Sequence, residues 1–145
     1  MEIVALDREN LGDIEMLWRE LNAHHLEHSN HFKGHFSSFT FKDRSRKLLA
    51  REKLAVFAAK DEEALVGFCI ASAEGRAGEI DSLYVKPRCH GQNLGSRLTE
   101  CAMDWLHEQG CNEISVYVAE GNEAALPFYE RFGFRKRYDV LQIKS

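Results

Sequence analysis

The feature that most constrains the fold is a strand that runs through a glycine-bearing turn into a helix, between residues 79 and 98. Residues 79–85 read as a strand, Gly91 and Gly95 lie in the turn, and apolar residues then recur at helical spacing as far as Gly110. Such a turn directs unpaired backbone N–H groups at one point, where the helix dipole adds partial positive charge. The stretch therefore predicts a phosphate or pyrophosphate site, and ordinary packing glycines are the alternative interpretation.

The turn does not match either of the common nucleotide-binding fingerprints. Residues 91–96 lack the Gly-Lys-Ser/Thr ending of a P-loop and the Gly-x-Gly-x-x-Gly spacing of a dinucleotide-binding turn. A general nucleotide-binding domain is therefore disfavoured.

The remaining sequence predicts strands and helices in an order typical of an α/β fold. We expect strands near residues 1–6, 54–59, 65–72, 79–85, 111–118 and 134–143, and helices near 7–28, 42–53, 92–109 and 122–132. Residues 29–40 have no clear period and are expected to form a loop or a short irregular helix. A three-strand meander joined to helix-separated strands predicts a mixed, mostly antiparallel sheet with helices on both faces. One domain over residues 1–145 is expected.

Charge and cysteine usage argue against several classes of protein. Lys and Arg total 19 against 23 Asp and Glu, a net charge of −4, which disfavours a nucleic-acid partner. We expect no membrane partner, because no run approaches the ~18 apolar residues of a membrane helix and the chain opens as a strand instead of a signal peptide. The cysteines 69, 89, 101 and 111 form no Cys-x-x-Cys pair and are expected to be free thiols. A cytoplasmic location follows as the expectation.

Two linked motifs cover the turn and a segment near the end of the chain. The first is matched at Val85, Pro87, His90, Gly91, Leu94 and Gly95, and the second at Asn122, Ala125, Phe128, Tyr129, Gly133 and Phe134. In their order and spacing they resemble the motifs of the GNAT superfamily of acyl-CoA-dependent N-acetyltransferases. The resemblance implies a three-layer GNAT-like fold over nearly the whole chain. It also implies acetyl transfer from acetyl-CoA to a primary amine by direct attack in a ternary complex, with no metal.

The resemblance further implies roles for single residues. Acetyl-CoA would be bound by Leu83, Tyr84, Val85, His90, Gly91, Gln92, Asn93, Leu94, Gly95, Ser96, Asn122 and Phe128. Glu79 is expected to accept the amine proton, directly or through water, and Asp81 on the same strand face is the other candidate. Tyr129 is expected to protonate the leaving thiolate, and the N–H of Val85 or its neighbour to stabilise the tetrahedral oxygen. Solvated strand carboxylates and a packed aromatic ring are the structural alternatives.

Two positions depart from the family pattern. His90 stands where Arg or Gln is usual, and Asn93 where a second glycine is usual. Because Asn tolerates positive φ better than other non-glycine residues, we expect the turn to persist with weakened cofactor binding. Arg88 and Arg97 are close enough in sequence to supply positive charge. The departures keep one alternative open, a non-catalytic acyl-CoA-binding or regulatory module on the same fold.

Five of the seven histidines lie between residues 24 and 35. On a continuing helix His24, His28, His31 and His35 would share a face and could bind zinc, whereas a polar helix face is the simpler interpretation. In a GNAT-like protein this segment would border the acceptor cleft. There the histidines would shape substrate choice together with Phe32, Phe36, Phe39 and Phe41.

The acceptor is expected to be a small-molecule or protein amine. The negative net charge and the paired carboxylates at positions 79 and 81 favour a cationic amine over an acidic one. The last expected strand, which holds Val140 and Ile143, could pair with a second copy, so a homodimer is possible.

Overall fold

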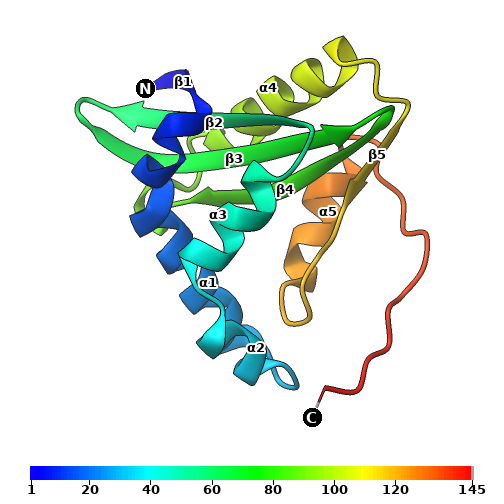
Figure 1. The fold of residues 1–145 in the computed structure, drawn as a ribbon. Helices are drawn as coiled ribbons and strands as arrows, with labels where there is room; N and C mark the ends of the chain where they lie inside the picture. The colour runs from blue at the N-terminus through cyan, green and yellow to red at the C-terminus, as the bar shows by residue number, and fades with distance from the viewer. Residues whose placement is uncertain (145) are drawn as a thin grey trace.

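Five strands form one sheet in the order β1-β2-β3-β4-β5 in a computed structural model that describes residues 1–144 (Figure 1). Their bounds are β1 Glu2–Leu6, β2 Lys53–Asp61, β3 Ala64–Glu74, β4 Ala77–Val85 and β5 Glu113–Val116. Strands β1 to β4 pair antiparallel, and β5 pairs parallel to β4. The predicted mixed, mostly antiparallel sheet is confirmed.

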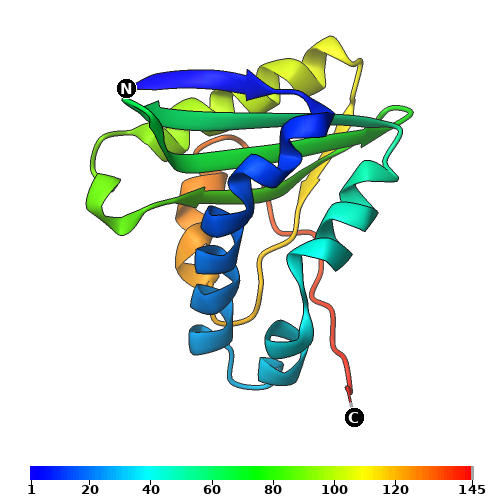
Figure 2. The ribbon, with the colours of Figure 1, turned by 60° about the vertical axis from the view of Figure 1, so that its left-hand side comes forward.

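Helices cover both faces of this sheet (Figure 2). On one face lies α4 (Leu94–Glu108), and on the other lie the short helix η1 (Arg8–Ile14), α1 (Glu15–His28) and α3 (Phe41–Leu49). Residues 66–73 of β3 are all buried because both faces of this strand are covered. A further short helix, α2 (Lys33–Ser38), forms in the segment expected to be irregular. No helix within residues 1–144 has the length and apolar character needed to cross a membrane.

Strands β4 and β5 separate halfway along β4. Their pairing ends at Ile80 and Val116, whereas β4 continues beside β3 as far as Val85. The separation begins beside a bulge, because Ile80 lies opposite Ala71 and Ser82 opposite Ile70, which leaves Asp81 as an extra residue. A bulge bends and twists its strand, so β4 leaves β5 and its edge beyond Ile80 is unpaired by the sheet.

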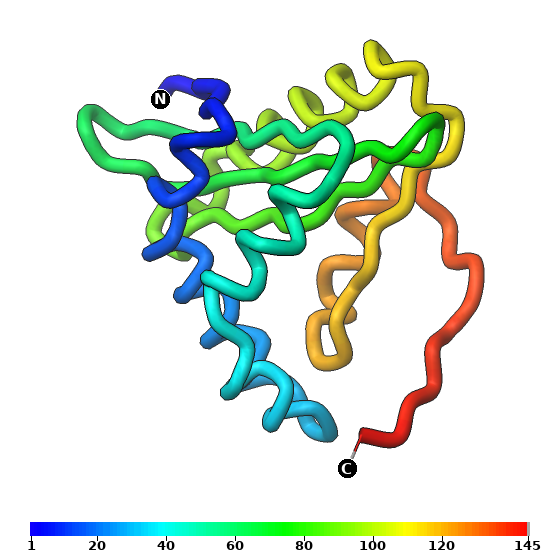
Figure 3. The backbone as a smooth tube through the Cα atoms, viewed as in Figure 1, coloured from blue at the N-terminus to red at the C-terminus, as the bar shows by residue number. Residues whose placement is uncertain are grey.

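The C-terminal part differs from the sequence-based expectation. Two short helices, η3 (Glu123–Ala125) and α5 (Leu126–Glu130), replace the one expected at 122–132. The strand predicted at 134–143 is wrong: the chain has no regular structure there and runs apart from the sheet (Figure 3). Phe134 packs on the core, but residues 135–144 are exposed, and the four-residue strand β5 offers only a short edge. Without buried side chains or a long partner, a strand has too little to stabilise it.

Candidate active site

A cavity of about 630 Å³ lies beside the N-terminal end of α4. Its walls come from α1, the unpaired end of β4, the turn after β4 and α5. The lining residues are Leu21, His24, Leu83, Tyr84, Val85, Pro87, Cys89, His90, Gly91, Asn93, Leu94, Gly95, Ser96, Asn122, Ala125, Phe128, Tyr129 and Arg131. Every residue expected to bind acetyl-CoA is among them except Gln92. The volume is in the range typical of small-molecule sites.

The turn before α4 takes the conformation that anion-binding turns require. Gly91 has a φ of 87° and Asn93 a φ of 62°, so the expectation that Asn93 accepts a left-handed conformation is confirmed. The N–H of Arg97 donates to the carbonyl of Asn93. The N–H groups of residues 94–96 precede that bond and have no helical acceptor. With the dipole of the 15-residue helix α4 behind them, they can receive an anion.

Arg131 brings positive charge to this cavity. Its guanidinium lies 5.3 Å from the centre of the Phe128 ring, in the cavity wall. The two arginines expected from the sequence are engaged elsewhere, because Arg88 pairs with Asp61 at 3.8 Å and Arg97 contacts the carbonyl of Met1 at 3.5 Å. The sequence could have pointed to Arg131, because this residue follows Phe128 by three positions on the same short segment.

A second cavity, of about 80 Å³, lies where β4 and β5 separate. Its lining residues are Leu21, His25, Ile80, Asp81, Ser82, Leu83, Val116, Tyr117, Val118, Ala119, Asn122 and Tyr129. Leu21, Leu83, Asn122 and Tyr129 line both cavities, so the two spaces adjoin.

Tyr129 stands at the junction of the two cavities. Its half-buried ring makes edge-on contacts with Phe128 and Phe134, with ring centres 5.2 and 5.9 Å apart. Burial raises the pKa of the Tyr129 phenol, so the group keeps its proton at neutral pH. A protonated phenol at this place can act as a proton donor.

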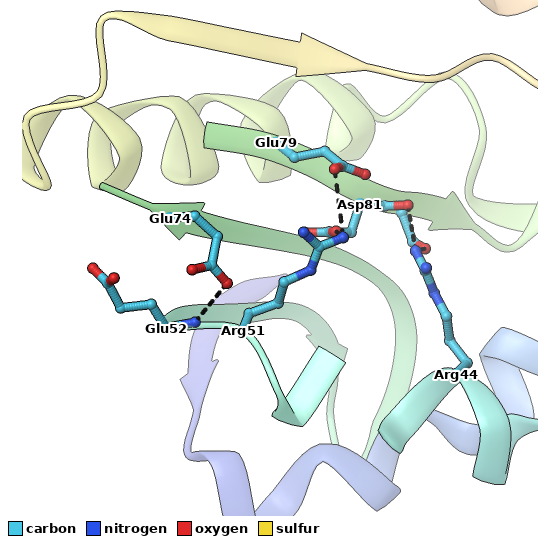
Figure 4. Close-up of polar contacts among 7 residues, drawn as sticks. Arg44, Arg51, Glu52, Glu74, Glu79 and Asp81 are labelled. Carbon is cyan, nitrogen blue, oxygen red and sulfur yellow. Dashed lines mark hydrogen bonds and ion pairs between the residues drawn. The ribbon is translucent and has the colours of Figure 1, made fainter. Parts of the chain in front are cut away.

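Two carboxylates lie two residues apart on β4, and one of them, that of Asp81, lines the smaller cavity; Figure 4 shows both side chains. The side chain of Asp81 is 0% exposed, and within residues 1–144 neither of its oxygens has a hydrogen-bond partner. Glu79 is not among the lining residues of either cavity. Burial, and then the neighbouring Asp81, raise the pKa of Glu79 to about 7, and burial raises the pKa of Asp81. The pair therefore holds a proton more readily than solvated carboxylates do.

Arginines from the segment that includes α3 face this pair. Nη2 of Arg51 lies 3.6 Å from Oε1 of Glu79 and 3.9 Å from Oδ1 of Asp81. Nη2 of Arg44 donates to the backbone carbonyl of Asp81 at 2.8 Å and to Oγ of Ser82 at 3.2 Å. Two guanidinium charges thus stand beside two carboxylates and weaken the argument that the pair alone attracts a cation. Nothing in the spacing of residues 44 and 51 relates them to β4, which is why sequence reasoning missed them.

The histidine segment is divided among three elements. Helix α1 ends at His28, His31 lies in the following loop and His35 lies in α2, so the single helical face considered for zinc does not form. Among residues 1–144 no group of three or more His, Cys, Asp or Glu side chains is arranged to hold a metal ion. His24 lines the larger cavity and His25 the smaller one.

The phenylalanines of the same segment, residues 32, 36, 39 and 41, are buried or half-buried. Phe39 and Phe41 pack on Trp18, with ring centres 5.7 and 5.6 Å apart. Phe36 contacts the ring of His25 at 5.4 Å. These contacts give Phe39 and Phe41 a structural role in packing against Trp18.

Comparison with known proteins places this arrangement in a family. The model described as "Acetyltransferase (GNAT) family" matches residues 15–134. A mycothiol acetyltransferase of Thermobispora bispora is 32% identical over 134 residues, which cover 86% of this chain and 44% of that protein. The chain spans less than half the length of the curated relatives it matches.

Solved structures share the fold over almost the whole chain. A ribosomal-protein-alanine N-acetyltransferase from Brucella melitensis biovar Abortus superposes with a TM-score of 0.72 at 16% identity and covers 100% of both chains. An aminoglycoside N-acetyltransferase in complex with CoA gives a TM-score of 0.71 at 16% identity, covering 99% of this chain and 98% of that one. The expected GNAT-like three-layer fold is confirmed.

Proposed function

This chain belongs to the acetyltransferase (GNAT) family, and we propose that it moves an acetyl group from acetyl-CoA to a primary amine. The observation that carries the proposal is the position of Tyr129, which lines both the larger cavity and the smaller one. A donor in the first cavity and an amine in the second would meet beside this phenol. Acetyl-CoA supplies a thioester carbonyl carbon that an amine nitrogen can attack directly.

The residues of the larger cavity fit the parts of acetyl-CoA. The free N–H groups of residues 94–96 and the charge of Arg131 suit the pyrophosphate. The edge of β4 at residues 83–85 is not paired with β5, so its backbone groups can bond the amides of pantetheine as a further strand would. We assign the N–H of Val85 or its neighbour to the carbonyl oxygen on which negative charge develops.

The carboxylates and the phenol would handle the two protons of the reaction. An alkyl amine is mostly protonated at neutral pH and must lose a proton before it attacks. We assign this proton to the Glu79–Asp81 pair, with Asp81 facing the smaller cavity and Glu79 behind it. Tyr129 would give its own proton to the leaving thiolate and regain one from the nitrogen, which must lose a second proton once its bond to the carbonyl carbon has formed. The products are the acetylated amine and free CoA thiol.

We infer that the acceptor presents a primary amine at a narrow end. The smaller cavity, at about 80 Å³, has room for only a few heavy atoms, so most of the acceptor would lie outside it. Relatives and structural neighbours are named for mycothiol, aminoglycosides and a ribosomal-protein alanine. Both small-molecule and protein amines therefore belong in a first screen.

The first test is thermal unfolding with and without acetyl-CoA, with adenosine diphosphate as the control ligand. Ligand at about a hundred times its dissociation constant should stabilise the fold by roughly 2.7 kcal/mol. A shift with acetyl-CoA beyond that with the control supports the cofactor site, and no shift at millimolar ligand contradicts it. Release of CoA thiol with a panel of amines then tests transfer. Binding without release from any amine class would favour a non-catalytic acyl-CoA-binding module.

A further inference from the structure

Two arginines contact β4 at Glu79 and Asp81 from outside the region that holds the GNAT motifs, Arg51 at the two carboxylates and Arg44 at the backbone carbonyl of Asp81 (Figure 4). We propose that Arg44 and Arg51 are positioning residues for acetyl transfer: Arg44 holds the β4 bulge at Asp81, and Arg51 sets how many protons the Glu79–Asp81 pair carries. This inference rests on the proposed function.

Arg44 meets a backbone group that the bulge leaves without a strand partner. Asp81 has no opposite residue in β3, and its carbonyl accepts from Nη2 of Arg44 at 2.8 Å. The same nitrogen reaches Oγ of Ser82 at 3.2 Å, so one half-buried guanidinium spans the bulge. A hydrogen bond from a charged donor is stronger than a neutral one. Arg44 thereby fixes the direction in which the side chain of Asp81 leaves the strand.

Arg51 lies between the two carboxylates. Its Nη2 is 3.6 Å from Glu79 and 3.9 Å from Asp81, and no other cation is as close to both within the described residues 1–144. A positive charge at this distance favours the ionised form of a carboxyl group and opposes the effect of burial. Arg51 therefore allows a pair that burial would keep protonated to release and take up a proton near neutral pH.

Three other titratable side chains around the pair, those of His25, Tyr129 and Cys69, stay neutral near pH 7. His25 of α1 and Tyr129 of α5 line the same cavity as Asp81. Cys69 of β3 is close enough to Asp81 for the charge of the carboxylate to act on its thiol. Burial lowers the pKa of His25 to about 4 and raises the pKa values of Tyr129 and Cys69. Tyr117, also at this cavity, is largely exposed. Unlike these three side chains, the carboxylate pair can titrate near neutral pH, because the pKa of Glu79 is raised to about 7.

The test for Arg51 is the pH profile of kcat/KM in Arg51→Gln. Loss of the positive charge should move the acidic limb to higher pH by about one unit, so that activity falls about tenfold at pH 6.5 and recovers by pH 8.5. Arg51→Lys keeps a charge and should shift the limb less. Arg46→Gln is the control, because Arg46 lies on the exposed side of α3, 3.8 Å from Asp43. An equal limb position in Arg51→Gln and Arg46→Gln would overturn the proposal.

A second measurement separates this inference from the proposed function. NMR titration of the carboxyl carbons of Glu79 and Asp81 in the free protein should show a higher pKa in Arg51→Gln than in wild type, whether or not an acceptor is known. Wild-type protein without transfer activity but with this shift would contradict the proposed function and keep the role of Arg51 in protonation. Unchanged carboxyl titration would overturn that role.

The test for Arg44 is Arg44→Lys, which preserves charge but replaces the planar donor. We expect kcat to fall about tenfold while the dissociation constant for acetyl-CoA changes less than twofold. The NMR signals of residues 80–82 should move, and those of the turn at 91–95 should not. Full kcat, or equal disturbance of both regions, would overturn a positioning role for Arg44.

Discussion

The carboxylate of Glu120 accepts a hydrogen bond of 2.7 Å from the hydroxyl of Ser29, and the two residues are 91 positions apart. The N–H of Asn30 donates to the same carboxylate at 3.0 Å. These bonds lower the pKa of Glu120, with that from Ser29 contributing most. The contact joins the loop after β5 to the loop after α1, on either side of the smaller cavity. It fixes the distance between two walls of the proposed acceptor site.

Gly121, next to Glu120, should tolerate no side chain. It has a φ of 90°, and a Cβ there would collide with the carbonyl of His28. Gly133 has a φ of 97° and no atom within 4 Å of such a Cβ, so it is a matched control. We expect Gly133→Ala to destabilise by about 1–2 kcal/mol from backbone strain alone. Gly121→Ala should lower the free energy of unfolding by clearly more. Equal losses in urea denaturation would show that the close approach of the two loops does not form in solution.

Tyr129→Phe should separate catalysis from binding. The ring and its packing are kept, while the proton donor is removed, so we expect kcat to fall about a hundredfold with the dissociation constant for acetyl-CoA nearly unchanged. Tyr138→Phe is the control, since Tyr138 is 61% exposed on the C-terminal segment. Stopped-flow or steady-state thiol release gives kcat, and calorimetry gives the binding constant. A Tyr129→Phe protein with full kcat would remove this residue from the mechanism.

Much of the fold could be predicted because its signals are local. The strand–turn–helix at residues 79–108 depends on alternation, a glycine and helical periodicity, and the left-handed Asn93 follows from the tolerance of Asn for positive φ. The prediction of a strand at 134–143 was wrong because a strand also needs a neighbouring strand to pair with. Val140, Leu141 and Ile143 have the composition of a strand, but no element packs on them. Pairing of this segment with a second copy stays a prediction.

The candidate site was predictable only where one segment supplies it. The residues of the larger cavity come chiefly from the turn and from α5, whose spacings carry the family pattern. The carboxylate cluster joins β4 to Arg44 and Arg51, and the bulge at Asp81 decides which side chain meets the cavity. A one-residue change of register has no signature in a single sequence. The sequence already named Asp81 as a second candidate base, but its place at the smaller cavity and the two arginines beside it needed the three-dimensional arrangement.

Gly95→Ala should distinguish a ligand contact from a packing requirement. A Cβ at Gly95 would meet only the Phe128 ring, at 3.7 Å, which is ordinary contact, so the free protein should keep its stability. If a pyrophosphate approaches the first turn of α4, the added methyl group should weaken acetyl-CoA binding about tenfold. Calorimetric titration measures the binding constant, and thermal unfolding without ligand measures the stability. Unchanged binding would mean that the donor does not approach this turn.

Asn93→Gly should tighten acetyl-CoA binding. The φ of 62° is easier for glycine than for Asn, and removal of the side chain clears space beside the anion site. We expect the dissociation constant to fall severalfold. Asn93→Val should have the opposite effect and weaken acetyl-CoA binding, because a β-branched residue disfavours this φ. Identical affinities in the two variants would show that Asn93 does not limit the site.

His25→Gln should change how stability depends on pH. Burial, followed by the nearby charges of His24 and His28, lowers the pKa of His25 from 6.5 to about 4. Between those values the unfolded state binds more protons, so His25 removes stability as the pH falls through this window.

Glu79 acts in the opposite sense, because its pKa is raised from 4.5 to about 7 and its contribution is lost as the pH rises through that window. Without His25 its share of the stability loss at low pH disappears, so the variant should lose less stability than wild type between about pH 7.5 and pH 5. Urea denaturation at both pH values measures this, with His107→Gln on the exposed side of α4 as the control. An unchanged difference in His25→Gln would mean that His25 is protonated in the folded state at an ordinary pH, and therefore that it does not lie buried beside the smaller cavity.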